Sequence, residues 1–233
     1  MVRVHLTKVS VFGTGNHGIH ISDCIVPAGE VCGGGSGGGG NGSPASVYLR
    51  LSGVVVDGAA FGLADADNVR VDERDAGDII LSVTNSEFLN SGNDGLEVDE
   101  GDDGDVLLNV RNAVFEGNGA YCLPWEDFPA LDPECDDDGD ADVDDGMDVD
   151  EAGDGSVIGM VRNVAFLDNF DEGMDFDEEG EGGFDLVVVR FGGVGNEDEA
   201  MKISEEDGGD VAVSLRSVRT RDNNGNSEGI EIE

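Results

Sequence analysis

The chain has 233 residues and a formal net charge of -41, from 53 Asp and Glu against 12 Lys and Arg. Charge of this sign excludes general binding to nucleic acid or anionic lipid and favours cations or cationic partners. No apolar stretch is long enough to cross a bilayer. Disordered acidic chains lack regularly spaced Val, Ile and Leu, which this chain has, so we expect a folded domain.

A repeated pattern begins near the start of the chain. Gly18 to Asp23 alternate apolar and polar residues and end on an acid, and Val69 to Glu73 form a second weak copy. Residues 24–46 lie between these copies and contain a glycine-rich tether. This order predicts a loop inserted into a repetitive fold.

The middle of the chain carries the strongest copies. Each has an apolar alternation, an Asn, a Phe, a Gly and a second apolar alternation that ends in acids. The copies span 79–100, 106–151 and 157–178, and weaker ones follow at 201–205 and 230–233. Most steps are 27 residues, and the second copy is longer because it contains an insertion at 119–145.

Two runs with a period of two residues in every repeat predict short strands stacked into parallel sheets, with little helix. Matching positions should then lie over one another. This alignment predicts a turn ladder of Asn85, Asn112 and Asn163. It also predicts an aromatic stack and an inward column, which are Phe88, Phe115 and Phe166, and Val83, Val110, Val161, Val189 and Leu215.

The repeat with its Asn and Phe ladders resembles the right-handed parallel β-helix proteins of the pectate-lyase-like superfamily. We therefore expect an all-β fold, a right-handed parallel β-helix of about seven coils of roughly 27 residues. It would form one domain over residues 1–233, with loop insertions at 24–46 and 119–145. The fold hosts lyases, hydrolases, epimerases, adhesins and non-catalytic repeats, so the resemblance implies no one activity. Both ends stop within the repeat without a cap, which predicts a piece of a longer chain with neighbouring domains.

The second run of each strong copy places two acids on the outward face of one strand. Stacked about 4.8 Å apart, like charges repel by roughly 1 to 3.5 kcal/mol per pair. Bound Ca²⁺ would offset this repulsion, because it accepts several carboxylate oxygens in flexible geometry. A solvated acidic edge with diffuse counter-ions, or adaptation to high salt, is the alternative. The predicted metal-binding grid is Glu97, Asp99, Asp148, Asp150, Asp175 and Asp177, flanked by Glu100, Glu151 and Glu178.

The second insertion holds an alternating run of aspartates. Asp136, Asp138 and Asp140 resemble the calcium loops of EF-hand and thrombospondin type 3 repeats, with Gly139 at the turn. The match is partial, because Glu134 replaces the usual first Asp. A solvated acidic loop is the alternative.

Two further groups of residues complete the candidate sites. Four arginines follow the last inward residue of a first strand, and could hold carboxylates of an acidic polysaccharide or pair with acids such as Asp168 or Glu116. These arginines are Arg111, Arg162, Arg190 and Arg216. Four cysteines fit two local disulfides and an oxidising compartment, although three pairings, free thiols or metal ligation stay open. They are Cys24, Cys32, Cys122 and Cys135.

No His, Tyr or Lys is grouped with acids as a general base, so no catalytic residue is predicted. We expect a non-catalytic, extracellular or cell-surface scaffold that binds Ca²⁺ and serves adhesion or envelope structure. The alternative is a calcium-dependent carbohydrate-active enzyme, a polysaccharide lyase or glycoside hydrolase acting on an acidic polysaccharide.

Overall fold

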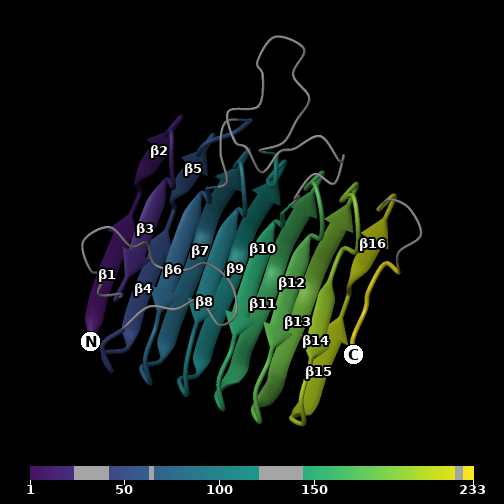
Figure 1. Ribbon diagram of the computed structural model, residues 1–233. Coiled ribbons are helices and arrows are strands. Elements are labelled where there is room, and N and C mark those ends of the chain that lie inside the picture. The colour runs from purple at the N-terminus through teal and green to yellow at the C-terminus, as the bar shows by residue number, and fades with distance from the viewer. Residues whose placement is uncertain (24–41, 63–65, 121–143, 224–227) are drawn as a thin grey trace, which may run out of the picture.

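The computed structural model describes residues 1–23, 42–62, 66–120, 144–223 and 228–233, and every regular element in these ranges is a β-strand (Figure 1). The ten-stranded sheet contains β1 (Val2–Thr7), β2 (Ser10–Phe12), β4 (Val47–Ser52), β5 (Val55–Asp57), β7 (Ile79–Leu89), β9 (Val106–Glu116), β11 (Ser156–Leu167), β13 (Gly183–Val194), β15 (Asp210–Arg216) and β16 (Arg219–Arg221). The six-stranded sheet contains β3 (Ile19–Ser22), β6 (Val69–Glu73), β8 (Leu96–Glu100), β10 (Met147–Glu151), β12 (Met174–Glu178) and β14 (Lys202–Glu205). No helix that could cross a membrane occurs in these described ranges.

The chain alternates between the two sheets, and all strand pairs are parallel. Each strand lies beside the strand one repeat later, so Leu96 of β8 pairs with Val69 of β6 and Met147 of β10. This register confirms the predicted all-β architecture with long parallel sheets, which is compatible with a β-helix or solenoid. Most of the two predicted insertions, at 24–41 and 121–143, lies outside the described residues.

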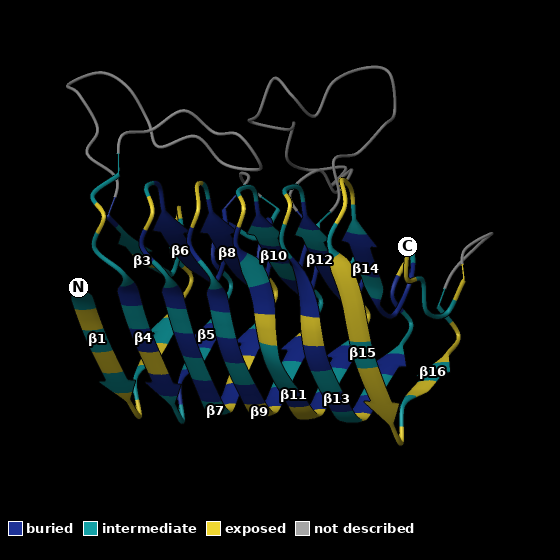
Figure 2. Ribbon diagram, turned by 90° about the horizontal axis from the view of Figure 1, so that it is seen from below, coloured by how far each residue is buried: buried dark blue, intermediate teal, exposed yellow. Residues whose placement is uncertain are grey.

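Alternating apolar side chains of both sheets make one continuous core. Figure 2 shows buried positions along the strands of both sheets. The predicted aromatic stack is part of it. Ring centroids of Phe88 and Phe115 lie 5.0 Å apart, and those of Phe115 and Phe166 lie 4.8 Å apart. In the next repeat Gly193 takes the ladder position, and the ring of Phe191 extends the stack instead, 5.1 Å from Phe166.

Each long strand of the ten-stranded sheet bends at a residue with positive φ. Asn85, Asn112 and Asn163 occupy the bends with φ between 51° and 55°. Their amides hydrogen bond along the stack at 3.0 Å, which confirms the predicted ladder. Asn tolerates this left-handed conformation better than most residues.

A second, buried Asn ladder was not predicted as such. Ser91 donates to Asn118 at 2.8 Å, and Asn118 donates to Asn169 at 2.9 Å. Asn169 donates in turn to Asn196 at 2.9 Å. These side chains satisfy polar groups at the corner where the chain leaves the ten-stranded sheet. The sequence signal is an Asn three residues after Phe115 and after Phe166, with Ser91 at this position after Phe88.

Candidate cation-binding site

The predicted carboxylate grid lies in register on the six-stranded sheet. Asp148 of β10 pairs with Glu97 of β8 and Asp175 of β12. Asp150 pairs in the same way with Asp99 and Asp177. The stacking that the grid requires is therefore confirmed, while metal binding by these residues stays a prediction.

The grid is not the solvated acidic edge that the sequence left as the alternative to cation binding. Glu97, Asp99 and Asp175 are buried, with 5%, 1% and 8% of their surface exposed. Asp148 and Asp150 are half-buried. Removing carboxylates from water penalises their charged form, so neutralisation by protons or cations is more necessary here than on an open surface.

A third acidic column, one that the sequence interpretation missed, runs beside the grid. Its members are all buried, and each lies just before one of the strands β6, β8, β10, β12 and β14; a Gly or Ala follows every member except Asp67, which Asn68 follows. They are Asp67, Asp94, Asp145, Glu172 and Glu199. Backbone amides link them, since Asp94 N–H donates to Asp67 Oδ1 at 3.1 Å and Asp145 N–H to Asp94 Oδ1 at 2.7 Å. The sequence signal that could have revealed this column is the acid that recurs at the same position of each repeat.

Arginines neutralise the acids at the N-terminal end of the sheet. Arg70 of β6 forms ion pairs with Glu97 and Asp99. Its Nε atom also lies 2.9 Å from Asp72 Oδ1, and Arg74 Nη2 lies 2.8 Å from Asp99 Oδ2. Burial alone would raise the pKa of Asp72, but a hydrogen bond with His20 and the charge of Arg70 lower it below its usual range.

A lysine plays the same part at the C-terminal end. Lys202 Nζ lies 2.6 Å from Asp175 Oδ2 and 3.7 Å from Glu172 Oε1. Burial would lower the pKa of Lys202, but the hydrogen bond to Asp175 and the surrounding carboxylates raise it. The ammonium group is therefore held in its charged form.

The middle of the field has no such partner. Within the described residues, neither Asp148 nor Asp150 forms an ion pair with a basic side chain. Burial and the neighbouring charge of Asp99 raise the pKa of Asp150 to about 8. Burial and the charge of Asp150 also raise the pKa of Asp148 well above its usual range. Negative charge is thus least compensated at β10.

Two sets of three buried carboxylates could each share a cation. One oxygen from each of Asp145, Glu172 and Asp175 lies within 4.8 Å of the others. Asp67, Asp94 and Glu97 form the equivalent set. Oxygens on opposite sides of a bound Ca²⁺ are about 4.6 to 5.2 Å apart, so these separations suit it. Oδ1 of Asp145 is buried and has no hydrogen-bond partner among the described residues.

The glutamates expected to flank the grid instead turn inward at the corner after each strand. Glu100 accepts a hydrogen bond from Asp102 N–H at 3.2 Å, and Glu151 accepts one from Gly153 N–H at 3.0 Å. Glu178 makes the same contact with Gly180 at 2.9 Å. Burial raises the pKa of Glu151 to about 8 and that of Glu100 to about 11. Each glutamate caps its own turn, and they form a buried column along the stack.

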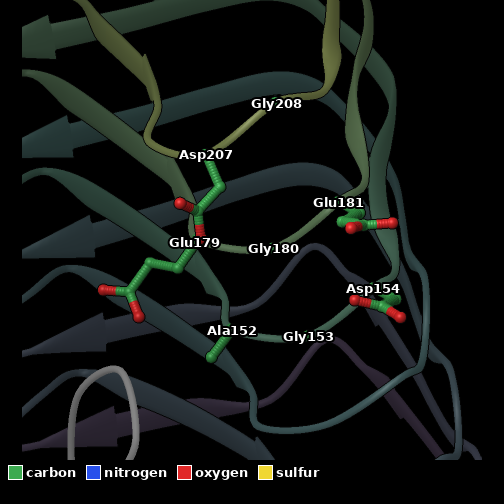
Figure 3. Close-up of a pocket in the computed structure, with 8 residues that line it drawn as sticks. All are labelled: Ala152, Gly153, Asp154, Glu179, Gly180, Glu181, Asp207 and Gly208. Carbon is green, nitrogen blue, oxygen red and sulfur yellow. The ribbon is translucent and has the colours of Figure 1, made fainter.

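Acidic side chains line a hollow outside this corner, which has a volume of about 720 Å³. Figure 3 shows Asp154 and Glu181 one above the other on one side, and Glu179 and Asp207 on the other. Glycines form the floor, which exposes backbone between the acids. The hollow adds to the negative field but holds no basic or aromatic side chain.

The four arginines do not form one column. Arg162 pairs with Arg111 on one side and with Val189 on the other, and Val189 pairs with Arg216. The prediction that Arg190 belongs to this column is wrong, because Val188 and not Val189 is the inward residue matching Val161. Arg190 occupies the next position, the bend, with a φ of 57°.

Several predicted residues lie outside the described part of the chain. They are Asp136, Asp138 and Asp140 of the insertion, and the cysteines Cys24, Cys32, Cys122 and Cys135. The calcium loop and the disulfides therefore stay predictions.

Comparisons with known proteins do not identify this site. No protein-family model, no curated protein and no solved structure matches the chain. Membership of the pectate-lyase-like superfamily accordingly has no support beyond the architecture. The chemical role of the acidic field rests on the geometry of its own side chains.

Proposed function

We propose that this chain is a calcium-binding, non-catalytic scaffold of the extracellular space or cell surface, with a role in adhesion or envelope structure. In this proposal the parallel sheets belong to a right-handed β-helix of about seven coils, each of roughly 27 residues. The proposal depends on one observation, the uncompensated carboxylates at β10.

Both ends of the acidic field carry their own cations. Arg70 and Arg74 serve the first repeats, and Lys202 serves the last. Asp148 and Asp150 lie between them in unbroken register. A hard divalent cation that accepts several carboxylate oxygens would supply the missing charge at this point.

Support for a non-catalytic role comes from the basic side chains. Lys202 is held in its charged form by Asp175, so it does not accept a proton. The expectation that no His is grouped with acids is wrong, because His20 Nε2 lies 2.6 Å from Asp72 Oδ2 and His17 Nδ1 lies 3.0 Å from Asp67 Oδ2. The arginines that form no ion pair with a described acid lie on the ten-stranded sheet and not beside the carboxylate grid. This separation disfavours a lyase, whose acids and arginine would act on one substrate.

The test is thermal unfolding during a CaCl₂ titration, with NaCl and MgCl₂ at matched ionic strength. Saturating Ca²⁺ should raise Tm by about 5 to 10 °C, as expected for a ligand at about 100 times its Kd. The double variant D148N/D150N should lose most of this shift. The control variant D102N/D103N removes the same amount of charge from the exposed turn after β8 and should keep the full Ca²⁺ shift of Tm.

A CaCl₂ shift no larger than that of matched NaCl would exclude specific binding and leave salt adaptation as the explanation. If D148N/D150N keeps the full Ca²⁺ shift of Tm, the cation binds at another site. Elemental analysis after dialysis against low calcium gives an independent measure of bound metal.

A further inference from the structure

A second hollow, of different chemistry, lies at the bend of the ten-stranded sheet. It has a volume of about 450 Å³ and is lined by Arg190, Phe191, Gly192, Ser217 and Arg219. Arg190 and Arg219 are exposed, whereas Phe191 is buried beneath them. No acidic residue is among those that line it.

Arg190 and Arg219 belong to the arginines of the ten-stranded sheet that form no ion pair with a described residue. The chain has 53 acidic residues against 12 Lys and Arg, so a free arginine has many possible partners. Arg70, Arg74, Lys202 and Arg221 all form ion pairs. Within the described residues, neither Arg190 nor Arg219 forms one. The two therefore keep their hydrogen-bonding capacity free for a ligand.

The backbone holds Arg190 in an unfavourable conformation. Its φ of 57° falls in the left-handed region that Asn85, Asn112 and Asn163 occupy at the same position in earlier repeats. Arg lacks the short polar side chain that makes this conformation tolerable for Asn. It also ends the exposed Asn ladder, so local stability does not explain its presence.

The floor of the hollow is open because Gly192 has no side chain. A Cβ atom added there would have nothing within 4 Å. In the parallel register Gly192 lies between Ala165 and Arg219, so the missing side chain leaves space beside the guanidinium of Arg219. Ser217 adds a hydroxyl group at the rim.

We propose that this hollow binds an oxyanion group, a carboxylate, sulfate or phosphate, between the guanidinium groups of Arg190 and Arg219. A planar guanidinium donates two parallel hydrogen bonds to such a group, which gives orientation as well as charge. The Ser217 hydroxyl donates a further bond. This binding is independent of the cation site, which lies on the six-stranded sheet.

The test is a titration of the whole chain with sodium sulfate, sodium phosphate and sodium acetate, at about 0.15 M total ionic strength to screen the net charge. Amide NMR shifts near residues 190–192 and 217–219 should saturate with at least one of the three. The tightest of these anions identifies the ligand class. R190N and R219Q should each weaken binding at least tenfold, as loss of a charged hydrogen-bond partner does.

The variants are chosen to fold. R190N restores the residue found at this bend in three earlier repeats. R50Q removes an exposed arginine of β4, far from the hollow in the strand order, and should leave binding unchanged. Shifts that do not saturate, that persist in R190N, or that vanish in R50Q would overturn the proposal. The Ca²⁺ shift of Tm should be the same in all three variants, so failure here is distinguishable from failure of the cation site.

Discussion

Lys202 Nζ lies 2.6 Å from Asp175 Oδ2, at the position in the repeat that Glu97 and Asp148 occupy earlier in the stack. β14 thus supplies a cation at the position where β8, β10 and β12 supply acids, as Arg70 of β6 does before them. Because the ammonium neutralises Asp175 from one side only, the charge of Asp148 on the other side is left uncompensated. A cation bound at β10 would neutralise Asp148 in the way that Lys202 neutralises Asp175.

Replacing Lys202 by Met should destabilise the metal-free protein by about 1 to 2 kcal/mol, because it leaves Asp175 and Glu172 without their half-buried partner. Saturating Ca²⁺ should restore part of this loss, so the Ca²⁺ shift of Tm should be larger than in the parent. Urea unfolding with and without CaCl₂ measures both effects. K8M removes the exposed Lys8 and should change neither.

Gly155→Ala should destabilise the protein by at least about 2 kcal/mol. A Cβ atom at this position would collide with the carbonyl oxygen of Gly104 in the preceding repeat and would lie 2.8 Å from Glu151 Oε1. Gly192→Ala is the control, because its Cβ would meet nothing. Similar unfolding midpoints for the two variants in urea would contradict this account of the corner.

The sequence was sufficient to predict the parallel stacking, because the period of 27 residues and the alternation of apolar side chains both appear in it directly. Asn85, Asn112, Phe88 and Phe115 all lie in the predicted register. The one-residue error at Val189 arose because β13 continues the apolar run through three valines, which hides the alternation.

The burial of the grid could not be predicted, because it depends on side chains from other repeats. Arg70 occupies the position of Glu97 in the preceding repeat, so the alignment put the two side by side, but it did not show that the arginine also reaches Asp99 and covers both acids. The inward turn of Glu100 and Glu151 was detectable in principle. Each is followed four residues later by a Gly that allows its close approach, whereas the sequence interpretation placed these glutamates beside the grid.

Phe166→Ala should lower the free energy of unfolding by about 3 to 5 kcal/mol, because the ring is fully buried between two others in the aromatic stack. Phe12→Ala provides the comparison, since 64% of Phe12 is exposed. Chemical unfolding of both variants measures the difference. A small loss for F166A would indicate that the stack collapses to fill the cavity.

Stability in metal-free buffer should fall as pH rises from 5 to 9. Burial raises the pKa of Glu73 and Glu172 to about 7, and that of Asp150 and Glu151 to about 8. In the unfolded chain these groups titrate near 4. The native state therefore holds more protons across this range, and the stability they contribute is lost as pH rises through the native pKa values.

Glu151→Gln should remove part of this pH dependence. The Gln carbonyl can still accept the Gly153 amide, and its NH₂ group can donate to neighbouring carboxylates that the ionised Glu151 repels. The free energy of unfolding of the variant should exceed that of the parent by on the order of 2 to 4 kcal/mol at pH 9 and should differ little at pH 5. E205Q is the matched control, because Gly209 and Gly208 amides lower the pKa of Glu205, so its contribution is lost only below pH 5. The measurement is urea unfolding in EDTA at pH 5, 7 and 9. If the free energy of unfolding changes equally with pH in E151Q and the parent, the corner glutamates are already ionised in the native state. The buried column would then be neutralised by something other than protons.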